Sequence, residues 1–358
     1  MRGEGRKRRR RLPFPAGKMR ARKNIRFTRR GFSRIIEPMR PEEERGYDLS
    51  APKKENYAGA PPTQVSGLMY TVTVIGMILV SFAFSVTLLL VAQATDGAVE
   101  DFQEKDWYKY CSYLLYQALY LLVILAYVFV FRKKPREFGY RKTHWKYFLI
   151  AIVLQIGLLF SLDWLNSWFI DFLGLFGYEA SSSSLPSMET AGGFVGVLVV
   201  VALLPAVLEE TIFRGVILSG MKLLGTTAAC LLGGLCFSLF HQSPEQTLYQ
   251  FVCGACFTLL AIRADSLFPT MLGHFFNNAL ILFNEKFGFL ALVGTGGEIA
   301  IYVASAVCLA ASVVYLIFFD RRTDAGRELP LGSFVKPAAP GLVVCGIMWV
   351  YVLVTGLL

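Results

Sequence analysis

Two carboxylates and one guanidinium stand together in an otherwise apolar stretch that runs from Leu203 to Met221. They belong to Glu209, Glu210 and Arg214. An ionisable side chain at the centre of a bilayer costs roughly 2.5–3.5 kcal/mol on insertion scales, so such groups are expected to pair or to line a water-filled cavity. Glu210 and Arg214 are four residues apart, share a helical face and have the favourable acid-first order for an ion pair. Glu209 lies about 100° away around the helix, and its carboxylate is therefore predicted to be free for chemistry.

Two histidines in later apolar runs are the groups that could meet Glu209. His241 follows Phe237 by four residues in CFSLFH, and His274 precedes Asn278 by four residues in LGHFFNN. At 1.5 Å per residue, Glu209, His241 and His274 lie about 20, about 22 and about 12 Å from their expected basic turns, depths that suit one chamber inside the membrane. A single buried His or Asn more often ties helices together by hydrogen bonds. Polar pairs in three neighbouring spans instead favour a shared catalytic site.

The order and spacing of these residues resemble the three motifs of the CPBP family, which groups CaaX-type proteases with bacteriocin-processing and immunity-associated membrane proteins. The resemblance covers about residues 190–285, and Phe213 precedes the arginine as it often does in the family. It implies an intramembrane endopeptidase that hydrolyses a peptide bond in a lipidated or membrane-associated peptide or protein, without a cofactor. The motifs are E-E-x-x-x-R (Glu209, Glu210, Arg214), F-x-x-x-H (Phe237, His241) and H-x-x-x-N (His274, Asn278).

The resemblance and the chemistry of peptide hydrolysis together assign catalytic roles to four residues. Glu209 and His241 are expected to activate a water molecule as general base. His274 and Asn278 are expected to donate hydrogen bonds to the oxyanion of the tetrahedral intermediate.

Three further motif residues are expected to support these four. Arg214 would hold Glu210, which would keep the helix and the Glu209 side chain in register. Phe237 would pack beside the catalytic pair.

A zinc mechanism is an alternative to this metal-free one. Its ligands would be His241, His274 and Glu210, since three protein ligands plus a water is the usual pattern of catalytic zinc. The H-E-x-x-H motif of zinc peptidases is absent, and the ligands would have to come from three separate helices. The sequence therefore favours a mechanism without a metal.

A rival hypothesis from another class is a non-proteolytic bacteriocin-immunity or membrane scaffold protein that binds a partner in the same cavity. Such a protein would tolerate the near-isosteric change Glu209→Gln. Other protease classes fit less well, because there is no G-x-S-x-G motif, and Asp163 and Asp171 belong to one span and its outer end. The repeated halves of a secondary transporter are not evident either.

The composition explains how these residues come to lie in a bilayer. The chain has 358 residues, of which 54% are hydrophobic, and a mean hydropathy of +0.49. This predicts an all-α polytopic membrane protein with about nine transmembrane helices and a catalytic core of the CaaX-protease type buried in the bilayer, since about 20 apolar residues cross it. The nine runs are 66–95, 110–131, 147–170, 191–222, 223–240, 246–262, 266–284, 299–319 and 341–358.

The charges of the connecting loops alternate along the chain. The loops around residues 132–146, 222, 263 and 321–327 are basic, whereas those around 96–106, 171–189, 245 and 285–298 are mainly acidic. The positive-inside rule then predicts an integral membrane protein with a cytoplasmic N-terminus, in the plasma membrane if the owner is a bacterium.

Three segments follow from this pattern. Residues 1–66 are predicted to be a disordered basic cytoplasmic tail, because residues 1–60 hold 19 Lys/Arg against 7 Asp/Glu and include RKRRRR at 6–11. The tail is expected to bind anionic lipids rather than nucleic acid, since no nucleic-acid-binding fold accompanies the charge. Residues 67–320 are the membrane-embedded protease core, with motifs at 209–214, 237–241 and 274–278. Residues 321–358 are a linker, including KPAAPG, and an extra C-terminal transmembrane helix.

Overall fold

The computed structural model describes residues 60–180, 185–320 and 329–357, and across these residues it is all-α, as the sequence predicts. Residues 1–59 of the predicted tail and residues 321–328 of the predicted linker lie outside the described residues. The last residues assigned to the tail are helical, because α1 begins at Pro62, and proline suits the first turn of a helix.

The helices follow one another along the chain with short connections. Their bounds are α1 (Pro62–Ala94), α2 (Val99–Gln103), α3 (Asp106–Val130), η1 (Pro135–Phe138), α4 (Lys146–Ser161), α5 (Asp163–Gly174), α6 (Ala191–Val197), η2 (Leu198–Leu203), α7 (Leu204–Glu210), η3 (Thr211–Ile217), α8 (Leu218–Met221), η4 (Lys222–Leu224), α9 (Thr226–Phe240), η5 (Pro244–Gln246), α10 (Thr247–Ala264), α11 (Phe268–Phe287), η6 (Phe289–Leu292), α12 (Thr295–Val314), η7 (Tyr315–Phe319) and α13 (Gly332–Thr355).

Seven helical stretches in the described residues are long and apolar enough to cross a membrane. The predicted count of nine is not confirmed. The run that ends in Phe240 forms a helix of only 15 residues. Helix α11 has 20 residues but contains polar side chains such as His274, Asn277 and Asn278, which lower its hydropathy. Helices α9 and α11 both carry motif residues. The helices that are too short or too polar to count as spans are therefore those that hold candidate catalytic residues.

Within the described residues, basic loops contact each other and acidic loops contact each other. Between basic loops the Thr143 hydroxyl donates to the Ala264 carbonyl at 2.7 Å. Between acidic loops the Tyr178 hydroxyl donates to Glu245 at 2.8 Å, and burial together with this hydrogen bond raises the pKa of Tyr178. The predicted alternation of loops is therefore present, while the side that faces the cytoplasm stays a prediction.

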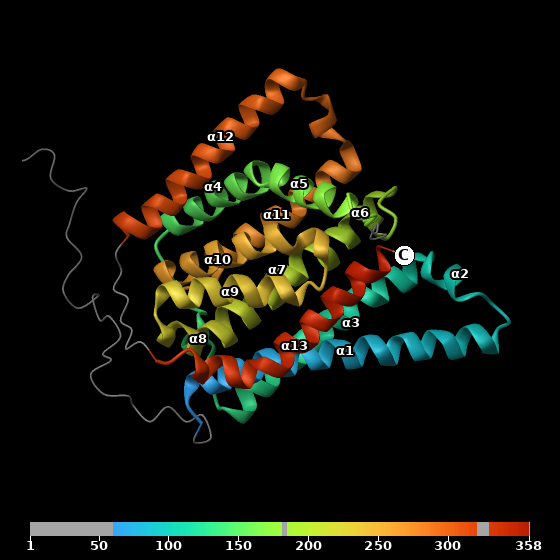
Figure 1. Ribbon diagram of the computed structural model, residues 1–358, viewed down its shortest axis with the longest axis horizontal. Helices are drawn as coiled ribbons and strands as arrows, with labels where there is room; N and C mark the ends of the chain where they lie inside the picture. The colour runs from blue at the N-terminus through green and yellow to red at the C-terminus, as the bar shows by residue number, and fades with distance from the viewer. Residues whose placement is uncertain (1–59, 181–184, 321–328, 358) are drawn as a thin grey trace, which may run out of the picture. The chain divides into compact units, whose positions relative to one another are not determined.

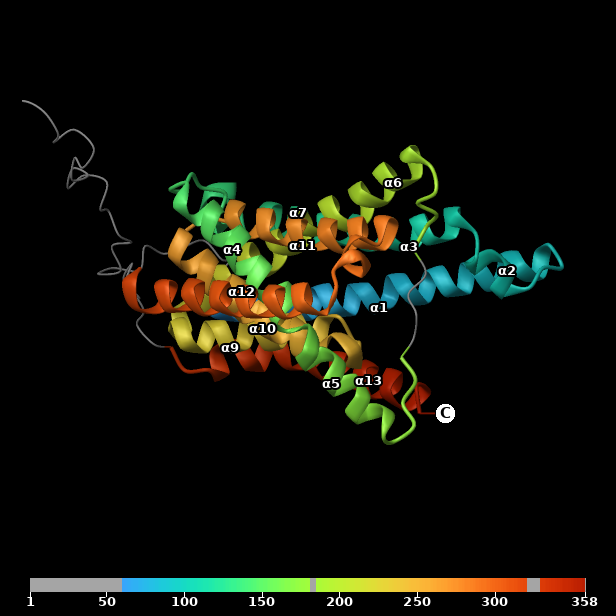
Figure 2. The same cartoon turned by 90° about the horizontal axis from the view of Figure 1, so that it is seen from above.

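The helices that carry the motifs lie in the middle of the bundle (Figure 1). Helices α9 and α10 run side by side in both views, and α4 packs against α11 and α12 (Figures 1 and 2). Helices α1, α3 and α13 cover the opposite side. Helices α9 and α10 approach closely because glycines meet at their contact: a Cβ on Gly254 would lie 2.9 Å from the Cα of Gly234.

Helix α13 corrects the prediction of a linker at KPAAPG. Residues 332–340 are helical and include Pro337 and Pro340. A hydroxyl from α1 bridges two backbone groups beside the prolines: Thr71 donates to the Pro337 carbonyl at 2.7 Å and accepts from the Gly341 N–H at 3.2 Å. This bridge ties the proline-containing part of α13 to α1.

The predicted span at 147–170 is present as the apolar stretch Lys146–Gly174, one of the seven. Its helix is interrupted, because α4 ends at Ser161 and α5 begins at Asp163. Leu162 caps both helices, with φ −104° and ψ −3°. The Asp163 carboxylate has an ordinary partner there, since it accepts from the Tyr302 hydroxyl at 3.3 Å.

Candidate active site

The helix that carries the two adjacent glutamates is wound irregularly around them. Helix α7 is flanked by two π-helical segments, η2 and η3, and such wider turns often occur at functional sites. Pro205 contributes to this irregularity because it has no N–H. The carbonyl of Val201, four residues earlier, therefore lacks the donor that it would have in a regular α-helix.

Arg214 and Glu210 form the ion pair expected from their spacing. Arg214 Nη1 donates to Glu210 Oε1 at 2.8 Å, and the two residues are only 4% and 0% exposed. Arg214 Nη2 also donates to the Gly254 carbonyl at 3.3 Å, and its guanidinium lies 4.3 Å from the ring centroid of Phe237. The pair thus joins the first motif to the second and to helix α10.

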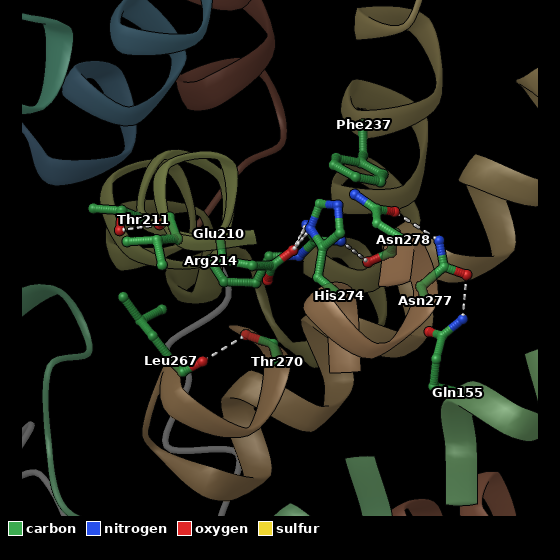
Figure 3. Close-up of polar contacts among 12 residues, drawn as sticks. Gln155, Glu210, Thr211, Arg214, Phe237, Leu267, Thr270, His274, Asn277 and Asn278 are labelled. Carbon is green, nitrogen blue, oxygen red and sulfur yellow. Dashed lines mark hydrogen bonds and ion pairs between the residues drawn. The ribbon is translucent and has the colours of Figure 1, made fainter. Parts of the chain in front are cut away.

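His274 contacts Glu210, and this contact was not foreseen from the sequence. Its Nδ1 lies 3.1 Å from Glu210 Oε1 (Figure 3). A carboxylate only accepts, so Nδ1 carries the proton and Nε2 is left for another partner. The same oxygen, Glu210 Oε1, therefore holds both Arg214 and His274.

His241 is held by its own helix. Its Nδ1 lies 2.7 Å from the carbonyl of Phe237, which only accepts, so Nδ1 carries a proton and the Nε2 of a neutral ring is free to accept. The Phe237 ring meets both imidazoles edge to face, at 4.8 Å from His241 and 6.2 Å from His274 between ring centroids. Phe237 therefore packs beside the two histidines.

Glu209 differs from its neighbour in having no hydrogen bond within the described part of the chain. Its side chain is partly buried and lies within electrostatic range of His274 and Tyr120. No hydrogen bond joins Glu209 to His241 among the described residues, so cooperation of this predicted pair would need a bridging water. Catalytic hydrogen bonds are often long in structures without substrate and tighten when it binds.

Asn278 lies on the same face of α11 as His274, and its carboxamide is held at both ends. Its Nδ2 donates to the Val201 carbonyl at 3.1 Å, and its Oδ1 accepts from Asn277 Nδ2 at 2.9 Å (Figure 3). Asn277 is held in turn by Gln155 and Tyr249. Gln155 and Tyr249 belong to none of the three motifs, although a glutamine within an apolar run is a signal of a buried polar contact.

The zinc alternative does not fit this arrangement. No three His, Cys, Asp or Glu side chains come together as a metal site in the described residues. Two of the proposed ligands, His274 and Glu210, bond to each other, and the Glu210 oxygen is also used by Arg214. No catalytic step is therefore derived through a metal.

Comparison with known proteins finds a match for the segment that holds this site. Residues 191–280 match the family model Rce1-like, described as type II CAAX prenyl endopeptidase Rce1-like. The match includes all three motifs, from Glu209 to Asn278. No curated protein and no solved structure matches the chain. The chain is thus an integral membrane protein in which residues 191–280 are similar to the Rce1-like family of type II CAAX prenyl endopeptidases.

Proposed function

We propose that this protein is an intramembrane endopeptidase that hydrolyses a peptide bond in a lipidated or membrane-associated peptide or protein. The observation that carries the proposal is the contrast between two adjacent carboxylates. Glu210 is fully buried and bonded to Arg214 and His274, whereas the partly buried Glu209 has no hydrogen bond in the described residues. Glu210 Oε2 also lacks a partner but is buried, so Glu209 is the carboxylate that a water can reach.

In the proposed reaction Glu209 accepts a proton from water while the water oxygen attacks the carbonyl carbon of the scissile peptide bond. His241 orients this water through Nε2, because its Nδ1 is occupied by the Phe237 carbonyl. The peptide C–N bond then breaks, and the proton held by Glu209 passes to the leaving amine. Water is consumed, and a carboxylate and an amine are formed.

The oxyanion of the tetrahedral intermediate would be bound from helix α11. Asn278 has a second hydrogen on Nδ2 beyond the one given to Val201. His274 can donate from Nε2 when its ring is protonated, and the Glu210 carboxylate on Nδ1 stabilises that charged ring. Donors fixed before the reaction stabilise developing charge without reorganisation.

Glu210 acts in this proposal as a positioning residue for His274. Its ion pair with Arg214 is expected to keep the carboxylate ionised, which fixes the proton of His274 on Nδ1. This role differs from the one expected from the sequence, in which Glu210 served only to hold the helix and Glu209 in register.

The experiment that tests the proposal uses the full-length protein in detergent and two peptides. One is a CaaX-type peptide with a farnesylated cysteine, and the other carries serine at that position. We expect release of the C-terminal tripeptide from the farnesylated peptide, detected by mass spectrometry. His274→Ala is expected to lower the rate by roughly 10²- to 10³-fold, the usual loss for an oxyanion donor.

The matched control is His144→Ala, since the exposed His144 ring accepts a hydrogen bond from the Lys146 N–H and lies outside the three motifs. This variant is expected to cleave like the parent. Binding of the farnesylated peptide without cleavage by the parent would contradict the proposal and would favour a binding or scaffold protein.

A further inference from the structure

A chain of hydrogen bonds runs behind Asn278 and connects four helical segments. It starts at the Val201 carbonyl in η2, passes through the carboxamides of Asn278 and Asn277 in α11, and ends at Tyr249 in α10 and Gln155 in α4. Its bonds measure between 2.6 and 3.1 Å. Figure 3 shows Asn278, Asn277 and Gln155 in this sequence.

The Val201 carbonyl sets the direction of every bond in this chain. A carbonyl only accepts, so Asn278 must present Nδ2 to it and Oδ1 to Asn277. Asn277 must then donate from Nδ2 to Asn278, which leaves its Oδ1 to accept from residues of α4 and α10. There it meets two donors, the Tyr249 hydroxyl at 2.7 Å and Gln155 Nε2 at 2.6 Å.

At the other end of this series of hydrogen bonds, Tyr249 and Gln155 fix the orientation of the Asn277 carboxamide. Gln155 Nε2 also donates to the Tyr249 hydroxyl at 3.0 Å, so the hydroxyl hydrogen is directed to Asn277. Gln155 is only 1% exposed and uses Nε2 for both of these bonds, whereas its Oε1 has no hydrogen-bond partner in the described residues. A flipped Asn277 would place its NH2 against two donors.

The bond between Asn278 and the Val201 carbonyl is related to Pro205. Because Pro205 lacks an N–H, the Val201 carbonyl has no regular α-helical donor and is open to a side chain. Asn278 is the side chain that supplies this donor. The proline in the first motif helix therefore explains why a residue of the third motif is bound there.

We propose that Asn277, fixed by Tyr249 and Gln155, is a positioning residue that holds the Asn278 carboxamide with its nitrogen toward the reacting carbonyl. The role in catalysis rests on the proposed function. The hydrogen-bond orientation stands on the contacts alone. If Asn277 were absent, Asn278 Oδ1 would lose its donor, and the single bond from Nδ2 to the Val201 carbonyl would hold the carboxamide less firmly.

The kinetic test compares Asn277→Ala in the parent and in an Asn278→Ala background. In the parent, kcat on the farnesylated peptide is expected to fall roughly 10- to 100-fold with KM unchanged, as for a misplaced catalytic group. In the Asn278→Ala background the same change is expected to cost nothing further. An equal loss in both backgrounds, or no loss in the parent, overturns the proposal, because a merely structural role does not depend on Asn278.

Tyr249→Phe protects the test against a variant that fails to fold. It removes one hydroxyl and leaves the ring, and Gln155 remains as a donor to Asn277. Its loss in kcat is therefore expected to be smaller than that of Asn277→Ala and again absent in the Asn278→Ala background. A Tyr249→Phe loss that persists in that background contradicts the positioning role.

A second measurement does not need activity and so separates this inference from the proposed function. With asparagine side chains labelled with ¹⁵N, the Asn278 amide signal is identified by its loss in Asn278→Ala. Asn277→Ala is expected to shift this signal. Asn284→Ala is the matched control on the same helix, because Asn284 binds the Leu290 N–H instead. An unshifted Asn278 signal in Asn277→Ala overturns the inference, whether or not the protein cleaves peptide.

Discussion

His274 and Glu210 are joined across 64 residues of sequence by a contact of 3.1 Å between Nδ1 and Oε1. This contact distinguishes the two adjacent glutamates of the first motif, because only Glu210 takes part in it. Glu210 belongs to a charge network that also includes Arg214, and Glu209 is left with an unengaged carboxylate among the described residues. The predictions below follow from this division and from the packing that supports it.

Removing the arginine of the network is expected to destabilise the protein more than removing both charges. Arg214→Met leaves the buried Glu210 without its cation and is expected to lower the free energy of unfolding by about 3–5 kcal/mol. The double variant Glu210→Gln/Arg214→Met has no unpaired charge and is expected to regain most of that loss. Thermal unfolding in detergent measures both. A double variant that melts no higher than Arg214→Met would refute the pairing argument.

The contact between α9 and α10 is expected to be intolerant of even one methyl group. A Cβ at Gly254 would lie 2.9 Å from the Cα of Gly234 and 3.0 Å from the Cβ of Phe237. Gly254→Ala is therefore expected to cost about 1–3 kcal/mol in stability and to lower cleavage, since Phe237 contacts both histidines. Gly346→Ala is the control, because nothing lies within 4 Å of its Cβ position. Equal melting temperatures for the two variants would contradict this prediction.

Helix α13 is expected to depend on one hydroxyl of α1. Thr71→Val keeps the shape of the side chain but removes the bridge between the Pro337 carbonyl and the Gly341 N–H. The expected loss is about 1–3 kcal/mol, the cost of unpaired buried polar groups. Thr87→Val on the same helix is the control, since its exposed hydroxyl bonds only to the Ala83 carbonyl. Thermal unfolding of both variants checks this, and a Thr71→Val protein as stable as Thr87→Val would show that the bridge is dispensable.

Metal removal is expected to leave cleavage unchanged. The three residues of the zinc alternative do not assemble as a metal site in the described residues, and His274 Nδ1 is committed to Glu210. Protein treated with a strong chelator, dialysed and assayed for zinc should retain the rate of untreated protein. Stoichiometric zinc, together with loss of cleavage that only added zinc restores, would establish the metal mechanism instead.

The sequence predicted best those features that depend on spacing along one helix. Glu210 and Arg214 pair because residues four apart share a helical face, and the loop charges alternate as predicted from the apolar runs. The contacts between distant segments could not be predicted in this way. The His274–Glu210 bond and the Gln155–Tyr249–Asn277 cluster depend on how helices pack.

The errors in the predicted elements have local physical causes. KPAAPG indicates a linker because proline interrupts a helix, whereas in the structure this segment is helical and packs against α1, where Thr71 bonds to it. The break at Leu162 falls inside an apolar run without glycine or proline nearby, so hydropathy alone could not locate it. Helix α11 is less apolar than a typical span because it carries His274 and three asparagines.

The most direct test of the central claim measures kcat on the farnesylated peptide for Glu209→Gln and for Glu285→Gln. Glu285 is exposed near the end of α11, so its variant controls for the loss of a carboxylate on a motif-bearing helix. We predict that Glu285→Gln cleaves like the parent, whereas Glu209→Gln loses roughly 10²- to 10⁴-fold, the usual contribution of a general base, at an unchanged melting temperature. Cleavage by folded Glu209→Gln at a rate close to that of the parent would contradict the assignment of Glu209 as the base.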